Sequence, residues 1–103
     1  MLKELEEVFK AYEKHQFDGG HVVEALKKLR EVYKLSGDPT LTKVCRLAYE
    51  HIEENGDFTV DLLEEREAGD KPSFAYFLDL LKDADNKFNR EEIQEYKQLL
   101  LEA

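Results

Sequence analysis

Apolar residues recur at three- and four-residue steps along most of the chain, and this spacing predicts helices. Such steps place apolar side chains on one face of a helix, whereas a half-buried strand alternates apolar and polar residues. No stretch of the chain alternates in that way over the length of a strand. The helical spacing occurs at about residues 2–12, 22–33, 41–52, 59–67, 74–81 and 90–101. The pattern therefore predicts an all-α protein.

Residues that start and stop helices lie between these segments. Gly37 follows the second segment and Gly56 follows the third, and glycine readily takes the left-handed conformation that ends a helix. Asp38 followed by Pro39 is typical of an N-cap and the first position of a helix. We therefore expect a short turn between the second and third helices.

Three joints share a pattern in which an aromatic residue precedes a capping residue, and an aliphatic residue follows the cap by four positions. This is the spacing of a hydrophobic staple. The three sets are Phe17, Asp18 and Val22; Phe58, Thr59 and Leu63; and Phe88, Asn89 and Ile93. One interpretation is three successive helical hairpins with joints near residues 17, 58 and 88. The other is a compact bundle of five or six short antiparallel helices, which the short connections favour.

The length and composition predict one domain over residues 1–103. A chain of 103 residues with 42% hydrophobic residues can bury one stable core, and it is too short for two ordinary ones. Cys45 is the only cysteine, which excludes an internal disulfide and a cysteine-based zinc site. The charged N-terminus and the absence of a long apolar run predict a cytoplasmic protein without membrane contact.

The net charge of −9 is distributed unevenly. Residues 50–70 contain nine acidic residues against Arg66 alone, whereas residues 27–46 carry an excess of basic residues. An acidic protein lacks the clustered Lys and Arg that bind nucleic acid, but an acidic patch accelerates encounters with a basic protein. The candidate partner-binding residues are Glu53, Glu54, Asp57, Asp61, Glu64 and Glu65, together with Tyr76. Packing in the core is the favoured use of Tyr76, and extension from its helix into a groove is the alternative.

Residues 81–92 resemble part of an EF-hand calcium loop. The oxygen-bearing residues at the third, fifth, ninth and twelfth loop positions are Asp83, Asp85, Asn89 and Glu92. The segment departs from the family at Leu81, where the first Asp belongs, and at Asn86, which replaces the glycine of the turn. The resemblance implies a divalent-cation site, while an acidic turn before a well-capped helix accounts for the same residues without a metal.

No catalytic motif is present in the sequence. His15, His21 and His51 lack the spacing of helical metal sites, and Cys45 lies among apolar residues, where cysteine acts as a small hydrophobe. The chain has no nucleophile elbow, phosphate loop or dinucleotide fingerprint. We therefore expect a non-enzymatic protein without a cofactor: an acidic interaction module (regulator, adaptor or immunity-type inhibitor), with a cation-binding protein and a structural subunit or homodimer as alternatives.

Overall fold

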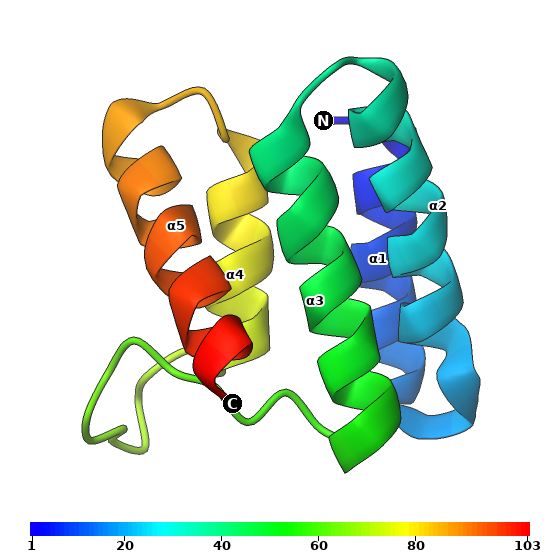
Figure 1. Cartoon of the computed structure of the whole chain (residues 1–103). Helices are drawn as coiled ribbons and strands as arrows, with labels where there is room; N and C mark the ends of the chain where they lie inside the picture. Colours follow the sequence, from blue (N-terminus) through cyan, green and yellow to red (C-terminus); the bar gives the residue numbers. More distant parts are fainter.

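The computed structural model describes residues 1–103 and contains five α-helices and no strand (Figure 1). The elements are α1 (Lys3–His15), a short 3-10 turn η1 (Asp18–Gly20), α2 (His21–Leu35), α3 (Pro39–Asn55), α4 (Ser73–Lys82) and α5 (Lys87–Glu102). The prediction of an all-α bundle is confirmed. None of these helices combines the length and the apolar character that crossing a membrane requires.

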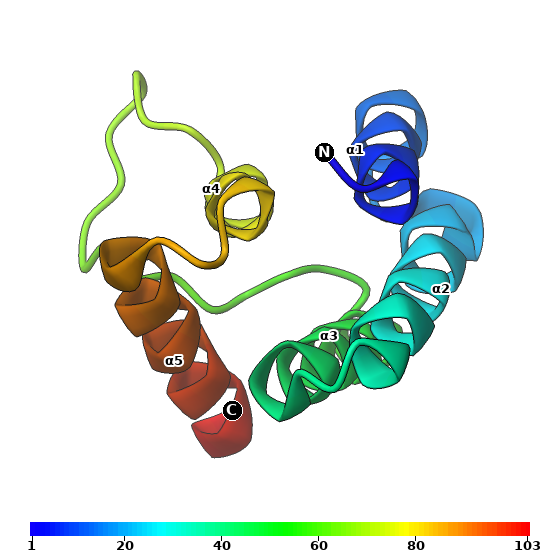
Figure 2. The ribbon, with the colours of Figure 1, turned by 90° about the horizontal axis from the view of Figure 1, so that it is seen from above.

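The five helices form a ring around the core. Seen from above, they follow one another in the order α1, α2, α3, α5 and α4, and α4 closes the ring against α1 (Figure 2). Helices that are consecutive in the chain are antiparallel, as expected, whereas α3 and α5 are neighbours that run in the same direction (Figure 1). This arrangement requires the chain to travel from the end of α3, past α5, to the start of α4.

Aromatic rings from the loop after α3 and from α4 and α5 pack together in the core. The ring centroid of Phe58 lies 5.1 Å from that of Phe74, 5.4 Å from that of Phe77 and 5.9 Å from that of Tyr96. Phe74 and Phe77 belong to α4 and Tyr96 to α5, but Phe58 lies outside the helices. The loop that follows α3 therefore contributes a side chain to the centre of the molecule.

The turn between α2 and α3 has the predicted form. Gly37 adopts a positive φ of 75°, and the Asp38 side chain accepts a hydrogen bond from the Leu41 N–H at 3.0 Å. The same carboxylate receives two hydrogen bonds from the Arg90 guanidinium, each at 3.1 Å. The N-cap prediction for Asp38 is confirmed, and the pair with Arg90 additionally ties this turn to α5.

The prediction of a fourth helix at residues 59–67 is wrong, because residues 56–72 form a loop. Phe58 and Val60 are both buried, while Leu63 is 47% exposed. Extended backbone directs residues two positions apart to the same side, whereas a helix would place them on different faces. The burial of both Phe58 and Val60, with Leu63 left at the surface, fits this non-helical backbone, and the second of the three hypothetical hairpins is absent.

The staple predictions at the second and third joints are also wrong. Leu63 lies at the surface, and Phe88 is 71% exposed. Helix α5 begins at Lys87, where Asn86 is the N-cap and accepts hydrogen bonds from the N–H groups of Phe88 and Asn89 at 2.9 and 3.1 Å. Because the helix starts earlier than predicted, Asn89 lies inside it and Phe88 faces solvent.

The first joint also differs from its predicted capping. Gly20, with a positive φ of 75°, is the N-cap of α2, and Asp18 makes no capping hydrogen bond. The Phe17 ring packs on Tyr12 and Phe74, with centroid distances of 5.3 and 5.2 Å. Phe17 therefore joins the aromatic cluster of the core, and glycine conformation sets the turn.

Candidate functional site

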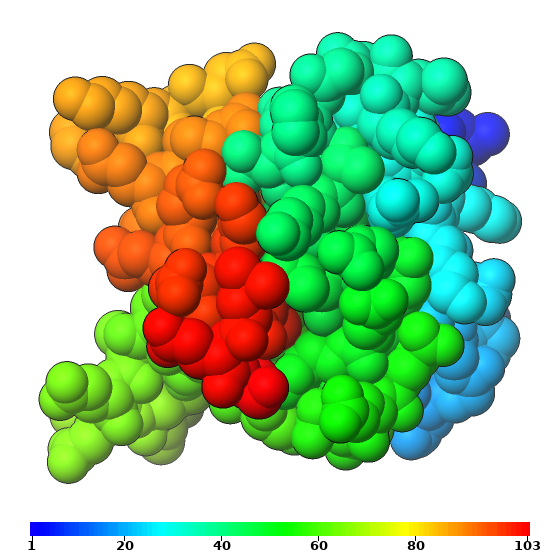
Figure 3. All heavy atoms as spheres, viewed as in Figure 1, coloured from blue at the N-terminus to red at the C-terminus, as the bar shows by residue number.

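The loop 56–72 projects from one end of the helical ring (Figures 1 and 3). Connections longer than about 12–15 residues without secondary structure are uncommon in compact domains and usually have a function. Most of the acidic excess of the chain lies on this loop and on the last turn of α3. The loop is therefore the main candidate for a functional surface.

His51 anchors the start of the loop. The Thr59 N–H donates to Nε2 of His51 at 3.1 Å, and the Thr59 hydroxyl lies 2.7 Å from the same nitrogen. The Asn55 side chain donates to the His51 carbonyl at 2.9 Å. His51 is 8% exposed. His51 thus forms hydrogen bonds with polar groups of the loop next to the core, a role that the sequence did not indicate.

Ser73 anchors the end of the loop. Its hydroxyl donates to the Val60 carbonyl at 2.7 Å and lies 2.9 Å from the Tyr96 hydroxyl. The Tyr96 hydroxyl also donates to the Ser73 carbonyl at 3.2 Å. Burial raises the pKa of Tyr96 above its ordinary value, so that the hydroxyl keeps its proton at neutral pH. This buried network joins the loop to α4 and α5.

The guanidinium of Arg66 stabilises the middle of the loop by hydrogen bonding, and in this sense the loop is braced. Its Nε and Nη2 donate to the two carboxylate oxygens of Asp61 at 2.7 and 2.6 Å, and its Nη1 donates to the Lys71 carbonyl. The hydrogen bonds from Arg66 hold the pKa of Asp61 below its ordinary value. Asp61, a predicted partner-binding residue, is therefore engaged inside the loop. Arg66 was missed, although it is the one basic residue in the acidic stretch.

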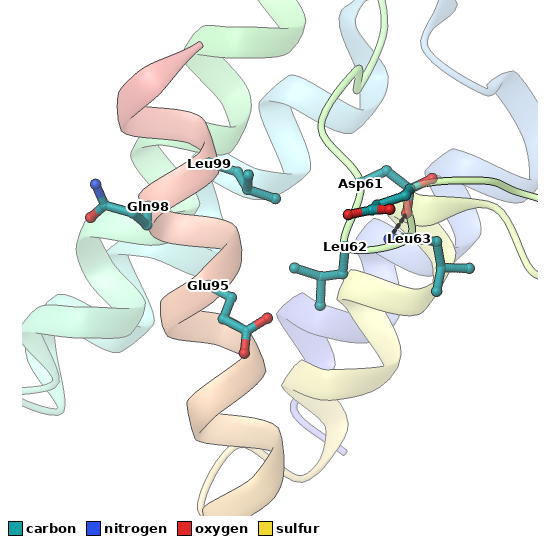
Figure 4. Close-up of a pocket in the computed structure, with 7 residues that line it drawn as sticks. Asp61, Leu62, Leu63, Glu95, Gln98 and Leu99 are labelled. Carbon is teal, nitrogen blue, oxygen red and sulfur yellow. Dashed lines mark hydrogen bonds between the residues drawn. The ribbon is translucent and has the colours of Figure 1, made fainter.

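A hollow of about 400 Å³ separates the braced loop from α5. Figure 4 shows Leu62 pointing from the loop toward α5, Leu99 pointing from α5 toward the loop, and the Glu95 carboxylate on the same side of α5 as Leu99. The lining residues are Asp61, Leu62, Leu63, Glu64, Glu95, Gln98 and Leu99. This hollow thus has apolar walls and acidic side chains. Sequence reasoning missed its α5 side, because Glu95 resembles any solvated helix residue and Leu99 resembles any apolar residue of a helix stripe.

A second hollow, of about 220 Å³, shares Leu62 and Leu63 with the first and includes Tyr76 and Glu92. The Tyr76 hydroxyl donates to the Glu92 carboxylate, whose two oxygens are both 2.8 Å away. This hydrogen bond is the main reason that the pKa of Tyr76 is raised to about 12. Tyr76 therefore lines a groove, with its hydroxyl bound to a carboxylate.

The remaining predicted partner-binding residues lie at the same end of the molecule. Glu54, Glu64 and Glu65 are exposed and make no ion pair. Glu53 lies 3.8 Å from the Lys27 ammonium, and Asp57 accepts a hydrogen bond from the Phe58 N–H at 2.8 Å. Three of the predicted carboxylates at this end are thus without an ion pair.

The opposite end of α3 carries the basic excess. A shallow hollow of about 440 Å³ there includes the side chains of Arg30, Lys34, Lys43 and Arg46. The loop and this basic hollow adjoin opposite ends of α3 (Figure 1). The charge asymmetry of the sequence is therefore also an asymmetry in space.

The four candidate cation ligands are not brought together. Residues 81–82 belong to α4 and residues 87–92 to α5, which leaves only residues 83–86 outside helices. The Asn89 amide donates to the Asp83 carbonyl at 3.1 Å, the Asp85 side chain is exposed, and Glu92 binds Tyr76. The segment has the form of the acidic turn before a capped helix, with Asn86 as the cap in place of Asn89.

The other chemically reactive side chains do not form a site either. The rings of His15 and His21 stack with centroids 3.7 Å apart, and Cys45 is fully buried, as predicted. Burial raises the pKa of the Cys45 thiol, which favours the unreactive protonated form. No group of three or more His, Cys, Asp or Glu side chains is arranged to hold a metal ion.

No protein-family model, curated protein or solved structure matches this chain. The function is therefore inferred from the geometry and charge of the loop and of the helices beside it.

Proposed function

We propose that this protein is a small, acidic, non-catalytic interaction module that binds a basic partner protein through the loop 56–72 and the adjoining side of α5. Regulation, adaptor activity and immunity-type inhibition are the roles that such a module performs. In this proposal the encounter occurs in the cytoplasm, where a lone thiol such as Cys45 stays reduced.

The observation that carries the proposal is that the loop holds apolar and acidic side chains together at the surface in a braced conformation. His51, Ser73 and Arg66 fix its start, end and middle. A braced loop loses little conformational entropy on binding, so more of the contact energy appears as affinity. The unpaired carboxylates around it would attract a basic protein from a distance.

A photo-crosslinking residue at position 65 would identify the partner in cells of the source organism. We expect it to capture a protein with a basic surface, whereas the same residue at position 28, on the outer face of α2, should not capture that protein. Capture of an acidic protein, or equal capture from both positions, would count against the proposal.

Charge reversal then tests the acidic surface with the captured protein. The double variant Glu64→Lys and Glu65→Lys should lower the association rate about tenfold at low salt and weaken its salt dependence, because the steering field is removed. The matched double variant Glu13→Lys and Glu31→Lys makes the same change of net charge on α1 and α2, and it should change the rate by less than about twofold. Stopped-flow measurements of both variants decide the question, and equal rates would refute the proposal.

A further inference from the structure

The hollow between the loop and α5 has features that specify its occupant more narrowly than charge alone. Three leucines line it, and two of them, Leu62 and Leu99, come from opposite walls and are only partly buried (Figure 4). With its volume of about 400 Å³, it is large enough to receive a large aliphatic side chain of a partner. An apolar side chain of a partner, its anchor, can therefore be buried against these leucines.

The side chains that surround this apolar contact are acidic. Glu64 on the loop and Glu95 on α5 both line the hollow, and neither makes an ion pair within the chain. A partner whose anchor enters the hollow brings its neighbouring side chains next to these carboxylates. Lys or Arg at those positions would pair with them, whereas Asp or Glu would be repelled.

The loop wall of the hollow is fixed before any partner arrives. The Leu63 N–H donates to Asp61 at 3.0 Å, and Asp61 is held in turn by Arg66. The preceding residue, Val60, is bound through its carbonyl to Ser73. Leu62 is thus held between two anchored residues and does not need to be ordered when a partner binds.

From this geometry we infer that the hollow binds a segment of a basic protein that presents one large aliphatic side chain flanked by lysine or arginine. The inference rests on the proposed function and specifies the contact that confers selectivity. The aliphatic anchor packs between Leu62 and Leu99, and the flanking cations pair with Glu64 and Glu95. Electrostatic attraction brings the basic partner to the surface, and burial of the aliphatic anchor determines which basic segment binds stably.

Synthetic peptides test this inference with the full chain. The first contains lysine and alanine with a single central leucine, the second has alanine in place of the leucine, and the third has glutamate in place of every lysine. We expect the leucine–lysine peptide to bind at least about tenfold more tightly than the second, because burying a leucine side chain is worth that ratio. The glutamate peptide should not bind. Calorimetry gives the affinities, and amide chemical shifts at residues 62–64 and 95–99 locate the contact.

Three variants in helix α5 assign the selectivity to the hollow. Leu99→Ala should remove most of the preference for the leucine peptide while the lysine peptides still bind. Leu101→Ala is the matched control, since Leu101 is 47% exposed on the same helix and does not line the hollow, and it should leave the preference unchanged. Glu95→Lys should weaken both lysine peptides by about fivefold. Circular dichroism checks that each variant stays helical.

The outcomes separate this inference from the proposed function. If the two lysine peptides bind equally well at the loop, the inference is overturned and the acidic interaction surface stands. If neither lysine peptide binds and the captured partner ignores charge reversal at Glu64 and Glu65, both are overturned. Tight binding of the glutamate peptide, or association of the chain with itself that blocks the hollow, would also overturn the inference by assigning a different occupant.

Discussion

The two connections that flank α3 are stabilised in different ways. The turn before α3 spans residues 36–38 and is set mainly by its own residues: Gly37 supplies the positive φ, and Asp38 caps the helix that follows. Its one remote partner is Arg90, which bonds the Asp38 carboxylate. The loop after α3 spans residues 56–72 and depends on remote partners. Val60 is bound by Ser73, thirteen residues away, and Ser73 contacts Tyr96, twenty-three residues further along the chain.

This difference indicates how each connection forms and what it can do. A turn encoded by adjacent residues can form before the rest of the protein is packed. The loop reaches its conformation only when α4 and α5 are in place, because Ser73 and the aromatic partners of Phe58 lie on those helices. The loop can therefore present a specific surface, but its order should depend on the core much more than the order of the turn does.

Removing the aromatic anchor of the loop should have the largest effect. Phe58→Ala deletes a buried ring that contacts Phe74, Phe77 and Tyr96, and it should lower the free energy of unfolding by about 3–5 kcal/mol. Urea denaturation measures the loss. The matched variant Phe88→Ala removes a ring that is 71% exposed and should change stability by less than about 0.5 kcal/mol. Equal losses would show that the loop is not anchored through the core.

Removing the buried hydroxyl of the loop network should have an intermediate effect. Ser73→Ala leaves the Val60 carbonyl without its donor and should cost about 1–3 kcal/mol, with faster proteolysis within residues 56–72. Ser36→Ala is the control in the turn, because Ser36 is exposed while its hydroxyl donates to the Tyr33 carbonyl at 2.9 Å. Its loss should be below about 0.5 kcal/mol. If both variants lose the same stability, remote anchoring does not distinguish the two connections.

The charge on Asp38 should have the smallest effect, and the effect should depend on pH. Burial alone would raise the pKa of Asp38, but hydrogen bonds from Arg90 and the Leu41 N–H outweigh it and lower the pKa. A carboxyl with a lower pKa in the folded state stabilises the fold above the unfolded pKa of about 3.9, and this stabilisation disappears as the pH falls through the folded pKa. Asp38→Asn keeps a capping side chain and removes the charge.

We therefore expect Asp38→Asn to lose about 1 kcal/mol at pH 7 and to approach the parent protein as the pH falls well below 4. Urea denaturation over a pH series measures the difference. The comparison variant Asp61→Asn removes the ion pair with Arg66 inside the loop. The stability difference between this variant and the parent should also shrink in acid, because Arg66 lowers the pKa of Asp61. A difference between Asp38→Asn and the parent that grows in acid would contradict the assignment.

Several features were predictable because they depend on neighbouring residues. The apolar spacing identified all five helices, and Gly37 with Asp38 identified the turn before α3. The burial of Cys45 followed from its place on an apolar stripe. The uneven charge is a property of composition along the chain, and the sequence alone therefore identifies the acidic end.

The candidate site was only half predictable. The acidic residues of the loop were identified, but the hollow also needs Glu95 and Leu99 from α5, which nothing in their local pattern distinguishes. Arg66 resembles a solvated surface residue until its contacts with Asp61 and Lys71 are known. These side chains acquire a role only through partners that the fold brings to them.

The amino-acid sequence by itself determined the helical class, the helix positions and the acidic character of one end, since these follow from periodicity, capping and charge within short stretches. Only the tertiary structure decided that residues 56–72 form a braced loop beside α5. Val60, Leu62 and Leu63 suit a helix as well as an extended chain locally. The choice between them came from burying Phe58 and Val60 in one core and from pairing the Val60 carbonyl with Ser73, energies that exist only after distant helices have packed.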